Sequence, residues 1–209
     1  MTMKKTIVLF DIDHTLFNTV TLVNSVYEKH SKSIDKEAFY KILEEIRVNL
    51  KQALSEVNTV KSGIASSLWE QAGLVKNFYE ETAGTLEEIS KIATVGIFSK
   101  GNEKFQKEKI KSISHFFSED NIHITLDKYK TLPEIVKRYE SDKLIIVDDM
   151  LRVLYAAKKL NENIVTVWIK REVYYEPYLL NQEPIKDFTP DATIFNLREL
   201  VPLVKKIKG

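Results

Sequence analysis

The stretch TIVLFDIDHT, residues 6–15, decides the fold because it joins a short apolar run directly to two acidic residues. Its first half is rich in branched and aromatic side chains without polar alternation, which is typical of a strand buried on both faces. If this strand belongs to a parallel sheet, Asp11 and Asp13 follow it at the carboxyl edge, where open α/β sheets bind ligands. The stretch therefore predicts an α/β protein with a site at that edge.

Further apolar runs of the same character recur along the chain, with helical patterns between them. They cover residues 94–98, 122–126, 143–147, 164–169 and 192–195. Alternation of buried strands and helices is the signature of an α/β fold. We therefore predict a Rossmann-like three-layer sandwich with a central, mostly parallel sheet.

The interval between the first two predicted strands is several times longer than the later intervals, and its pattern is helical. Phe39, Leu43 and Ile46 share one helix face, and Asp35 is placed to cap the beginning of that helix. We expect residues 18–85 to form an all-helical cap inserted after the first strand, and residues 1–17 and 86–209 to form the Rossmann-like core. The stretch 170–191, which holds three prolines, predicts an irregular connection before the last strand and helix.

Composition excludes several classes of protein. The 31 basic and 30 acidic side chains leave a formal charge of +1, without the basic excess of a dedicated nucleic-acid binder. The absence of cysteine excludes disulfides, thiolate catalysis and cysteine-ligated metals. The apolar runs are far shorter than the ~20 residues of a membrane span, and no signal-peptide cleavage pattern follows the first run. We expect a cytoplasmic protein without nucleic-acid or membrane partners; the sequence does not indicate an oligomeric state.

A second acidic pair has the same placement as the first. The run 144–147 leads directly into Asp148 and Asp149. If the two strand ends lie side by side, Asp11, Asp13, Asp148 and Asp149 bring up to four carboxylates around one point, which is unfavourable without a cation. A hard divalent cation, which prefers oxygen ligands, relieves that repulsion. The sequence thus predicts a metal site, and the alternative is a pair of Asp-rich turns that cap helices.

Two further segments lie between the acidic pairs. One strand ends in Ser99-Lys100-Gly101-Asn102, a turn that offers a hydroxyl and backbone N–H groups to phosphate oxygens, although a helix N-cap is the alternative. Lys128 and Lys130 then precede a helix predicted over residues 131–139. A lysine there would neutralise carboxylate and phosphate charge, while the alternative is a solvated surface lysine.

The ordered set of Asp-x-Asp-x-Thr, Ser, Lys and Asp-Asp resembles the haloacid dehalogenase (HAD) superfamily of phosphotransferases, and more narrowly its capped, phosphoglycolate phosphatase-like members. The resemblance covers nearly the whole chain, including the predicted cap. It implies that Asp11 is the nucleophile and Asp13 the general acid/base, and that the backbone carbonyl of Asp13 is a metal ligand. It also implies that Thr15 supports the first loop, and that Thr15, Ser99 and Lys100 bind the transferred phosphoryl group.

The third and fourth motifs follow from the same resemblance. We choose Lys130 as the catalytic and phosphate-binding lysine, because KTLPE at residues 130–134 resembles the Lys-Pro-x-Pro-Glu/Asp form of capped members; Lys128 is the alternative. Asp149 matches the direct Mg²⁺ ligand, and Asp148 matches the variable acidic neighbour, which contacts the metal either directly or through water. Val153 stands where some members carry an additional acidic residue.

The implied function is Mg²⁺-dependent hydrolysis of a small-molecule phosphate monoester through an aspartyl-phosphate. A phosphomutase of the same superfamily is the alternative, followed by a non-catalytic protein that binds a phosphorylated ligand. Asp13 argues against a dehalogenase, because halide departure needs no proton and those members lack this second aspartate. His14 replaces the usual glycine, and we expect it to be tolerated rather than catalytic.

Overall fold

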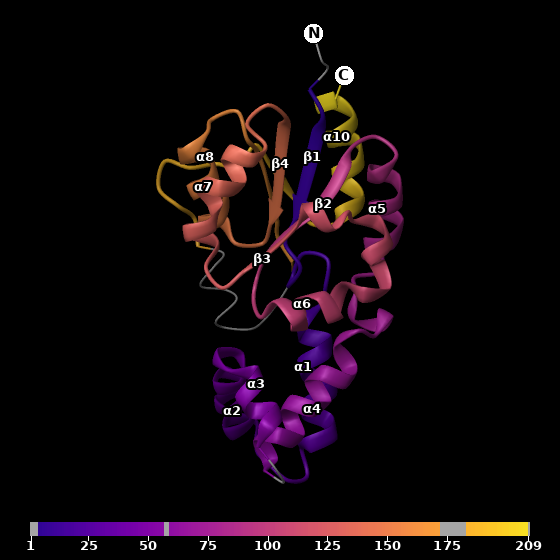
Figure 1. Ribbon diagram of the computed structural model, residues 1–209, viewed down its shortest axis with the longest axis vertical. Coiled ribbons are helices and arrows are strands. Elements are labelled where there is room, and N and C mark those ends of the chain that lie inside the picture. The colour runs from indigo at the N-terminus through magenta and orange to yellow at the C-terminus, as the bar shows by residue number, and fades with distance from the viewer. Residues whose placement is uncertain (1–3, 57–58, 172–182, 209) are drawn as a thin grey trace.

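The computed structural model describes residues 4–56, 59–171 and 183–208, which form a larger lobe around a sheet and a smaller helical lobe (Figure 1). The sheet has the strand order β3-β2-β1-β4-β5-β6, and every neighbouring pair is parallel. This confirms the predicted α/β class, and each predicted strand is present. The strands are β1 (Thr6–Phe10), β2 (Thr94–Lys100), β3 (Ile122–Thr125), β4 (Lys143–Asp148), β5 (Val165–Ile169) and β6 (Ala192–Ile194).

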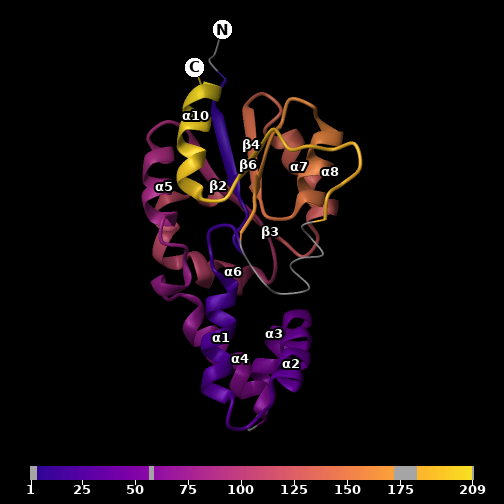
Figure 2. The ribbon, with the colours of Figure 1, turned by 180° about the vertical axis from the view of Figure 1, so that it is seen from behind.

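Helices cover both faces of the sheet, which explains why β1 is continuously apolar. Val8 and Phe10 point to one face, and Ile7 and Leu9 belong to the core on the other face. The first face is covered by α5 (Thr82–Ser90) and α10 (Leu200–Lys208), and the second by α7 (Lys128–Arg138) and α8 (Leu151–Leu160), as Figure 2 shows. The result is the predicted three-layer arrangement.

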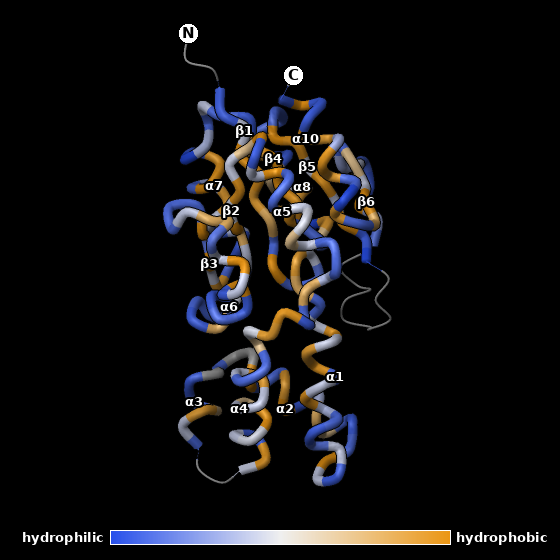
Figure 3. The backbone as a smooth tube through the Cα atoms, turned by 90° about the vertical axis from the view of Figure 1, so that its right-hand side faces the viewer, coloured by the Kyte–Doolittle hydropathy of each residue, from blue (hydrophilic) through white to orange (hydrophobic). Residues whose placement is uncertain are grey.

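The helical lobe consists of α1 (Thr19–His30), α2 (Lys36–Val48), α3 (Leu50–Ser55) and α4 (Val60–Ala72). Asp35 caps α2 as predicted, since its side chain accepts a hydrogen bond from the backbone N–H of Ala38. The rings of Tyr27 and Phe39 pack with centroids 5.1 Å apart inside this lobe. Hydrophobic stretches run along α1, α2 and α4 in Figure 3, so the lobe has an apolar interior.

Two segments of the chain connect the lobes, and these two segments lie side by side. The outgoing backbone N–H of Asn18 donates to the returning carbonyl of Asn77 at 2.6 Å, and the rings of Phe17 and Phe78 meet edge to face. The chain returns through a short turn, η1 (Val75–Asn77), and then enters α5, which packs against β2 and α10. The expected boundary at residue 85 therefore falls inside a helix of the sheet lobe, and the helices of the other lobe end at Ala72.

The strand order reverses beside β1, which sets the place of a ligand site. From β1 the chain builds outward through β2 and β3, connected by α6 (Glu103–Ile110), η2 (Lys111–Phe116) and η3 (Glu119–Asn121), and then crosses to β4. Phe10 pairs with Val147, so Asp11, just after β1, lies beside Asp148, the last residue of β4. After β6 the short helix η5 (Leu197–Glu199) leads into α10.

Half of the predicted irregular connection, residues 172–182, lies outside the described residues. Within the described part of the chain, no helix has the length and apolar character needed to cross a bilayer.

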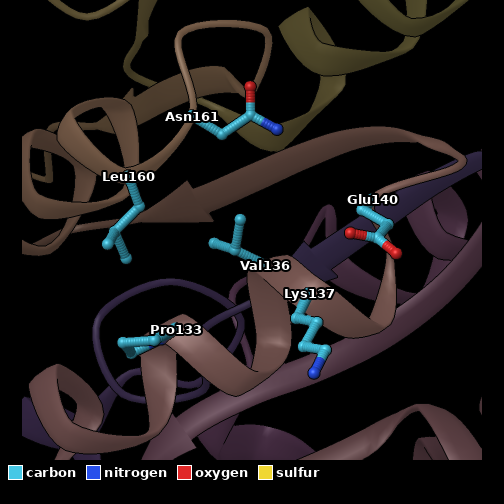
Figure 4. A pocket seen from close by; sticks show the side chains of 6 residues that line it. All are labelled: Pro133, Val136, Lys137, Glu140, Leu160 and Asn161. Carbon is cyan, nitrogen blue, oxygen red and sulfur yellow. The ribbon is translucent and has the colours of Figure 1, made fainter.

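A surface groove of about 330 Å³ lies between α7 and α8 (Figure 4). Leu160 and Asn161 line it at the end of α8, just before β5 begins, so the groove lies toward the amino edge of the sheet. It contains none of the predicted site residues; its other lining residues are Pro133, Val136, Lys137 and Glu140.

Candidate active site

A buried lysine joins the carboxyl ends of β1 and β4. Asp127 caps α7 by accepting hydrogen bonds from the backbone N–H groups of its first turn, and Lys128 follows as the first helical residue. The Lys128 ammonium Nζ lies 2.5 Å from Asp11 Oδ1 and 2.6 Å from Asp148 Oδ2. All three side chains are buried, and Asp149 is buried beside them. We call Lys128, Asp11, Asp148 and Asp149 the Lys128 centre.

The choice of Lys130 as the motif lysine is wrong. Its side chain is 86% exposed, and its Nζ lies 3.9 Å from the carboxylate of Asp127 rather than near Asp11. The physical reason is that α7 begins at Lys128, three residues earlier than predicted. Two residues correspond to about 200° around a helix, so Lys128 points to the sheet while Lys130 points to solvent. The alternative, Lys128, takes the place beside Asp11.

The Lys128 centre holds more negative than positive charge. Burial raises the pKa of Asp11, and the neighbouring Asp148 adds to this, so the pull of Lys128 does not bring it back to the usual range. Burial together with Asp11 and Asp148 also raises the pKa of Asp149 well above its usual value. Burial lowers the pKa of Lys128, but the two carboxylates outweigh this and raise it overall. Burial is thus the largest cause of the raised pKa of Asp11 and Asp149, and the neighbouring acidic groups add to it.

The donor set of this centre fits a divalent cation by its chemistry. With all four side chains ionised, three carboxylates and one ammonium leave a net charge of −2. As they stand, the acidic and histidine side chains of the described residues include no group of three gathered for a metal, and Lys128 bridges Asp11 and Asp148. The Mg²⁺ ligand set stays a prediction.

Asp148 is already engaged on both carboxylate oxygens. One oxygen binds Lys128, and the other accepts a 2.8 Å hydrogen bond from the backbone N–H of Met150. Whether Asp148 contacts a metal directly or through water stays a prediction. Asp149 is fixed through its main chain, because the indole N–H of Trp168 donates to its carbonyl at 3.0 Å.

Asp13 belongs to a second, partly buried centre that the sequence analysis did not foresee. The ammonium of Lys109, on α6, lies 2.6 and 2.9 Å from the two carboxylate oxygens of Asp13. The side-chain amide of Gln106 donates to Asp13 at 2.8 Å, and the hydroxyl of Thr19, the first residue of α1, donates at 2.5 Å. We call these four residues the Lys109 centre.

The electrostatics of the Lys109 centre are opposite to those of the first. Burial alone would raise the pKa of Asp13, but Lys109 and the hydrogen bonds of Thr19 and Gln106 lower it strongly. In this arrangement Asp13 is a carboxylate. To act as a base, as expected, Asp13 needs no change in protonation state. To donate a proton it must first take one up, which requires its ion pair with Lys109 to loosen.

The predicted phosphate-binding residues separate into two groups. Ser99 is buried at the end of β2, and its Oγ lies 3.3 Å from the amide Nε2 of Gln106, beside Asp13. Lys100, the next residue on the strand, is exposed because neighbouring strand residues point in opposite directions. Asn102, rather than Ser99, caps the following helix. Thr15 is buried in the first loop, where its backbone carbonyl accepts a hydrogen bond from Arg171 at 2.8 Å.

His14 lies at the tight turn of the first loop with a φ of 58°. This left-handed conformation favours glycine, which gives a structural reason why glycine is common at this position of the motif. His14 adopts it while its backbone N–H donates to the carbonyl of Phe17. That His14 is tolerated rather than catalytic stays a prediction.

A buried arginine behind the first loop was also missed. The guanidinium of Arg171, just after β5, donates to Glu81 at 2.7 Å and stacks 3.6 Å above the ring of Tyr79. Glu81 also accepts from the backbone N–H of Leu197. Through its bond to Thr15, Arg171 thus connects the returning segment with the loop that carries Asp11 and Asp13.

Local sequence offered little signal for these residues. Gln106 and Lys109 are spaced to share a helix face, but α6 reads EKFQKEKI, and Lys109 looks like its surface lysines. Arg171 follows another basic residue at the end of a strand. One useful signal is Gly101, whose φ of 155° and close contact with Gln106 leave no room for a Cβ.

Comparison with protein-family models and with curated proteins finds no match. Among solved structures, the chain is similar to a haloacid dehalogenase-like hydrolase from Burkholderia xenovorans, with 20% identity, 98% of each chain covered and a TM-score of 0.75. It is also similar to a HAD-hydrolase from Bacillus subtilis bound to magnesium, with 12% identity, 97% of this chain and 99% of that chain covered, and a TM-score of 0.67.

The L-2-haloacid dehalogenase from Xanthobacter autotrophicus is a third similar structure, with 15% identity, 97% of this chain and 99% of that chain covered, and a TM-score of 0.65. These likenesses extend over both lobes, since nearly the whole of each chain is covered. The chain therefore has the fold of the haloacid dehalogenase-like hydrolases.

Proposed function

We propose that this protein is a HAD-superfamily hydrolase, and specifically a Mg²⁺-dependent phosphatase that hydrolyses a small-molecule phosphate monoester through an aspartyl-phosphate. The observation that carries the proposal is the Lys128 centre, in which Lys128 bridges Asp11 to Asp148 beside Asp149. Phosphate monoesters resist hydrolysis because an anionic nucleophile must approach an anionic phosphorus, so the neutralisation of charge is a large part of catalysis.

In the first step a carboxylate oxygen of Asp11 attacks the phosphorus in line, the bond to the leaving oxygen breaks, and Asp11 carries the phosphoryl group. Lys128 holds Asp11 in place and offsets negative charge on the carboxylate and the phosphoryl group. The Ser99 hydroxyl binds a phosphoryl oxygen. Asp11 and Asp149, with the backbone carbonyl of Asp13, would hold the Mg²⁺, which supplies positive charge that stabilises the transferring group.

In the second step Asp13 accepts a proton from a water molecule whose oxygen attacks the phosphorus. The bond to Asp11 breaks, and inorganic phosphate leaves. Asp13 is suited to this step because Lys109, Gln106 and Thr19 keep it ionised and oriented. Donation of a proton to the leaving group in the first step requires Asp13 to be protonated after it separates from Lys109.

Asp13 also distinguishes this proposal from dehalogenation. The similar structures include an L-2-haloacid dehalogenase with chloropropionic acid covalently bound. Halide departure needs no proton, so a second aspartate held ready beside the nucleophile favours phosphate chemistry. A phosphomutase uses the same residues and differs in product, because it returns an isomeric sugar phosphate instead of inorganic phosphate.

We propose a small phosphorylated metabolite as the substrate, because a cap lobe that faces the carboxyl edge of the sheet suits small ligands (Figure 1). The test is hydrolysis of p-nitrophenyl phosphate and of a panel of metabolite phosphates, with Mg²⁺ and with EDTA. Inorganic phosphate is measured for each, and chloride release from 2-chloropropionate is measured in parallel. The same assays are run on Asp11→Asn and on Asp120→Asn, a surface control on η3.

The proposal expects phosphate release that needs Mg²⁺, is lost in Asp11→Asn and persists in Asp120→Asn. Chloride release without phosphate release would replace it with a dehalogenase. Accumulation of an isomeric sugar phosphate would replace it with a mutase. Folded protein that turns over none of these compounds would contradict an enzymatic role.

A further inference from the structure

Lys109 is a charged side chain in the protein interior, and burial of a charge is costly unless a partner compensates it. Only 6% of its side chain is exposed, and Asp13 is its ion-pair partner. The ammonium also lies 5.3 Å from the ring centroid of Phe17 and 5.0 Å from that of Phe105, a favourable distance for cation–π contact. The Lys109 ammonium therefore packs against two aromatic rings while it donates hydrogen bonds to both carboxylate oxygens of Asp13.

Gln106 connects Asp13 to Ser99 through hydrogen bonds of its side-chain amide. It precedes Lys109 by three residues on α6, so both side chains leave the helix on the same side. Its Nε2 lies 2.8 Å from Asp13 Oδ2, 3.3 Å from Ser99 Oγ and 2.8 Å from the carbonyl oxygen of Lys100. The amide thus links the second aspartate to the hydroxyl proposed to bind the phosphoryl group.

The sequence builds this arrangement locally. Gly101 lets the chain turn sharply after β2, and a Cβ there would lie only 2.8 Å from Nε2 of Gln106. Asn102 then caps α6 by accepting from the backbone N–H of Phe105, which fixes where the helix begins. The close turn and the cap together aim Gln106 and Lys109 at Asp13.

We propose that Lys109 and Gln106 are positioning residues that hold the Asp13 carboxylate for activation of the water in the second step. This inference rests on the proposed function. In that step Asp13 takes one proton from water, the water oxygen bonds to phosphorus, and the bond from phosphorus to Asp11 breaks. The two residues touch neither water nor phosphorus in this scheme, and act through Asp13.

The test measures the lifetime of the phosphoenzyme in the intact protein. Wild type and Lys109→Met are mixed with p-nitrophenyl phosphate and Mg²⁺, quenched in acid at successive times and examined by intact-mass spectrometry. Lys109→Met is expected to lengthen the lifetime about 100-fold, the usual order of a general-base contribution. Because the first step is less affected, kcat falls more than kcat/KM. Lys107→Met, a partly exposed neighbour on α6, is the matched control and should keep the wild-type lifetime.

The Asp13→Asn background separates positioning from a general structural role. If Lys109 acts through Asp13, the Lys109→Met change adds less than about twofold to the lifetime in that background. An equal lengthening in both backgrounds would overturn the inference, and so would a wild-type lifetime in folded Lys109→Met.

Gln106→Met keeps the inference testable if Lys109→Met does not fold. Methionine is similar in size to glutamine but lacks the amide group that donates to Asp13. The change is expected to lengthen the lifetime about tenfold, the usual order for a hydrogen bond to a charged group. An unchanged lifetime in folded Gln106→Met would then overturn the inference. Wild-type protein that turns over phosphate esters without any phosphoenzyme would instead overturn the proposed mechanism, and this inference with it.

Discussion

The two lysine–aspartate centres differ in their balance of charge, although they lie at the same edge of the sheet. In the Lys128 centre one ammonium faces Asp11 and Asp148, with Asp149 adding further negative charge. In the Lys109 centre one ammonium faces one carboxylate, and neutral donors complete the set. The pKa values of Asp11 and Asp149 are raised, while that of Asp13 is lowered.

This difference assigns different chemistry to the two centres. Surplus negative charge favours the binding of a cation and the approach of a phosphoryl group stabilised by it. A carboxylate that is ionised, paired with one ammonium and held by further hydrogen bonds has a fixed orientation, which suits a base. The comparison predicts that Mg²⁺ binds carboxylates of the first centre and leaves the side-chain contacts of the second centre unchanged.

The largest expected effect comes from Lys128→Met. It leaves Asp11 and Asp148 buried without their shared partner, which should lower the free energy of unfolding by about 3–5 kcal/mol. Turnover should fall at least ~10²–10³-fold. Lys130→Met, the matched exposed control, should change stability by less than about 0.5 kcal/mol. Urea unfolding and phosphate release check both variants. Loss of turnover in Lys130→Met alone would reverse the assignment of the lysine.

Mg²⁺ should stabilise the wild-type protein through the Lys128 centre. At a concentration of one hundred times Kd, the free energy of unfolding should rise by about 2.7 kcal/mol. Asp149→Asn should abolish this gain, and Gln106→Met, in the neutral centre, should retain it. The measurement is urea unfolding over a Mg²⁺ titration. An undiminished gain in Asp149→Asn would remove this residue from the metal site.

The two centres should respond to pH with opposite signs. The pKa of Asp149 is raised on folding, so without metal this residue destabilises the fold increasingly as pH rises above 3.8, its ordinary value. The pKa of Asp13 is lowered, so its stabilising contribution is present above 3.8 and is lost as pH falls below that value. In EDTA, Asp149→Asn should therefore exceed the wild type in stability at pH 7, on the order of 1 kcal/mol, and match it near pH 3. Unfolding curves at the two pH values decide this, and a less stable variant at pH 7 would contradict the account.

The smallest expected effect is that of His14→Gly. Relief of the left-handed conformation, about 1–2 kcal/mol for an L-residue, is partly offset by the greater entropy of unfolded glycine. The net gain in stability should be below about 1 kcal/mol, and kcat should change by less than about twofold. Steady-state kinetics on p-nitrophenyl phosphate provide the check, and a large fall in kcat would make His14 part of the chemistry.

The positions of the residues in the Lys128 centre were more predictable from the sequence than those in the Lys109 centre. Strand ends are readable because continuous apolar runs stop abruptly at Asp11 and Asp148, and parallel pairing then brings them together. The start of α7 was misjudged by three residues, and on a helix such an error exchanges a buried lysine for an exposed one. The helix cap at Asp127 is the feature that would have corrected it.

The second centre could not be read from the sequence, because its partners come from tertiary contacts. Gln106 and Lys109 are far from Asp13 along the chain, and polar residues on a lysine-rich helix resemble a solvated surface. Thr19 is only six residues from Asp13, but it is the first residue of the next helix. Glu81 and Arg171 pair for the same reason across a long separation. Buried ion pairs of this kind follow from the packing of helices on the sheet and leave no local pattern.

The measurement that tests the central claim most directly is the location of the phosphoryl group during turnover. Protein quenched in acid while it hydrolyses p-nitrophenyl phosphate is digested, and the modified residue is identified by tandem mass spectrometry. The account predicts one added phosphoryl group on Asp11, sensitive to hydroxylamine and absent from Asp11→Asn. A phosphoryl group on another residue, or continued turnover by Asp11→Asn, would contradict it.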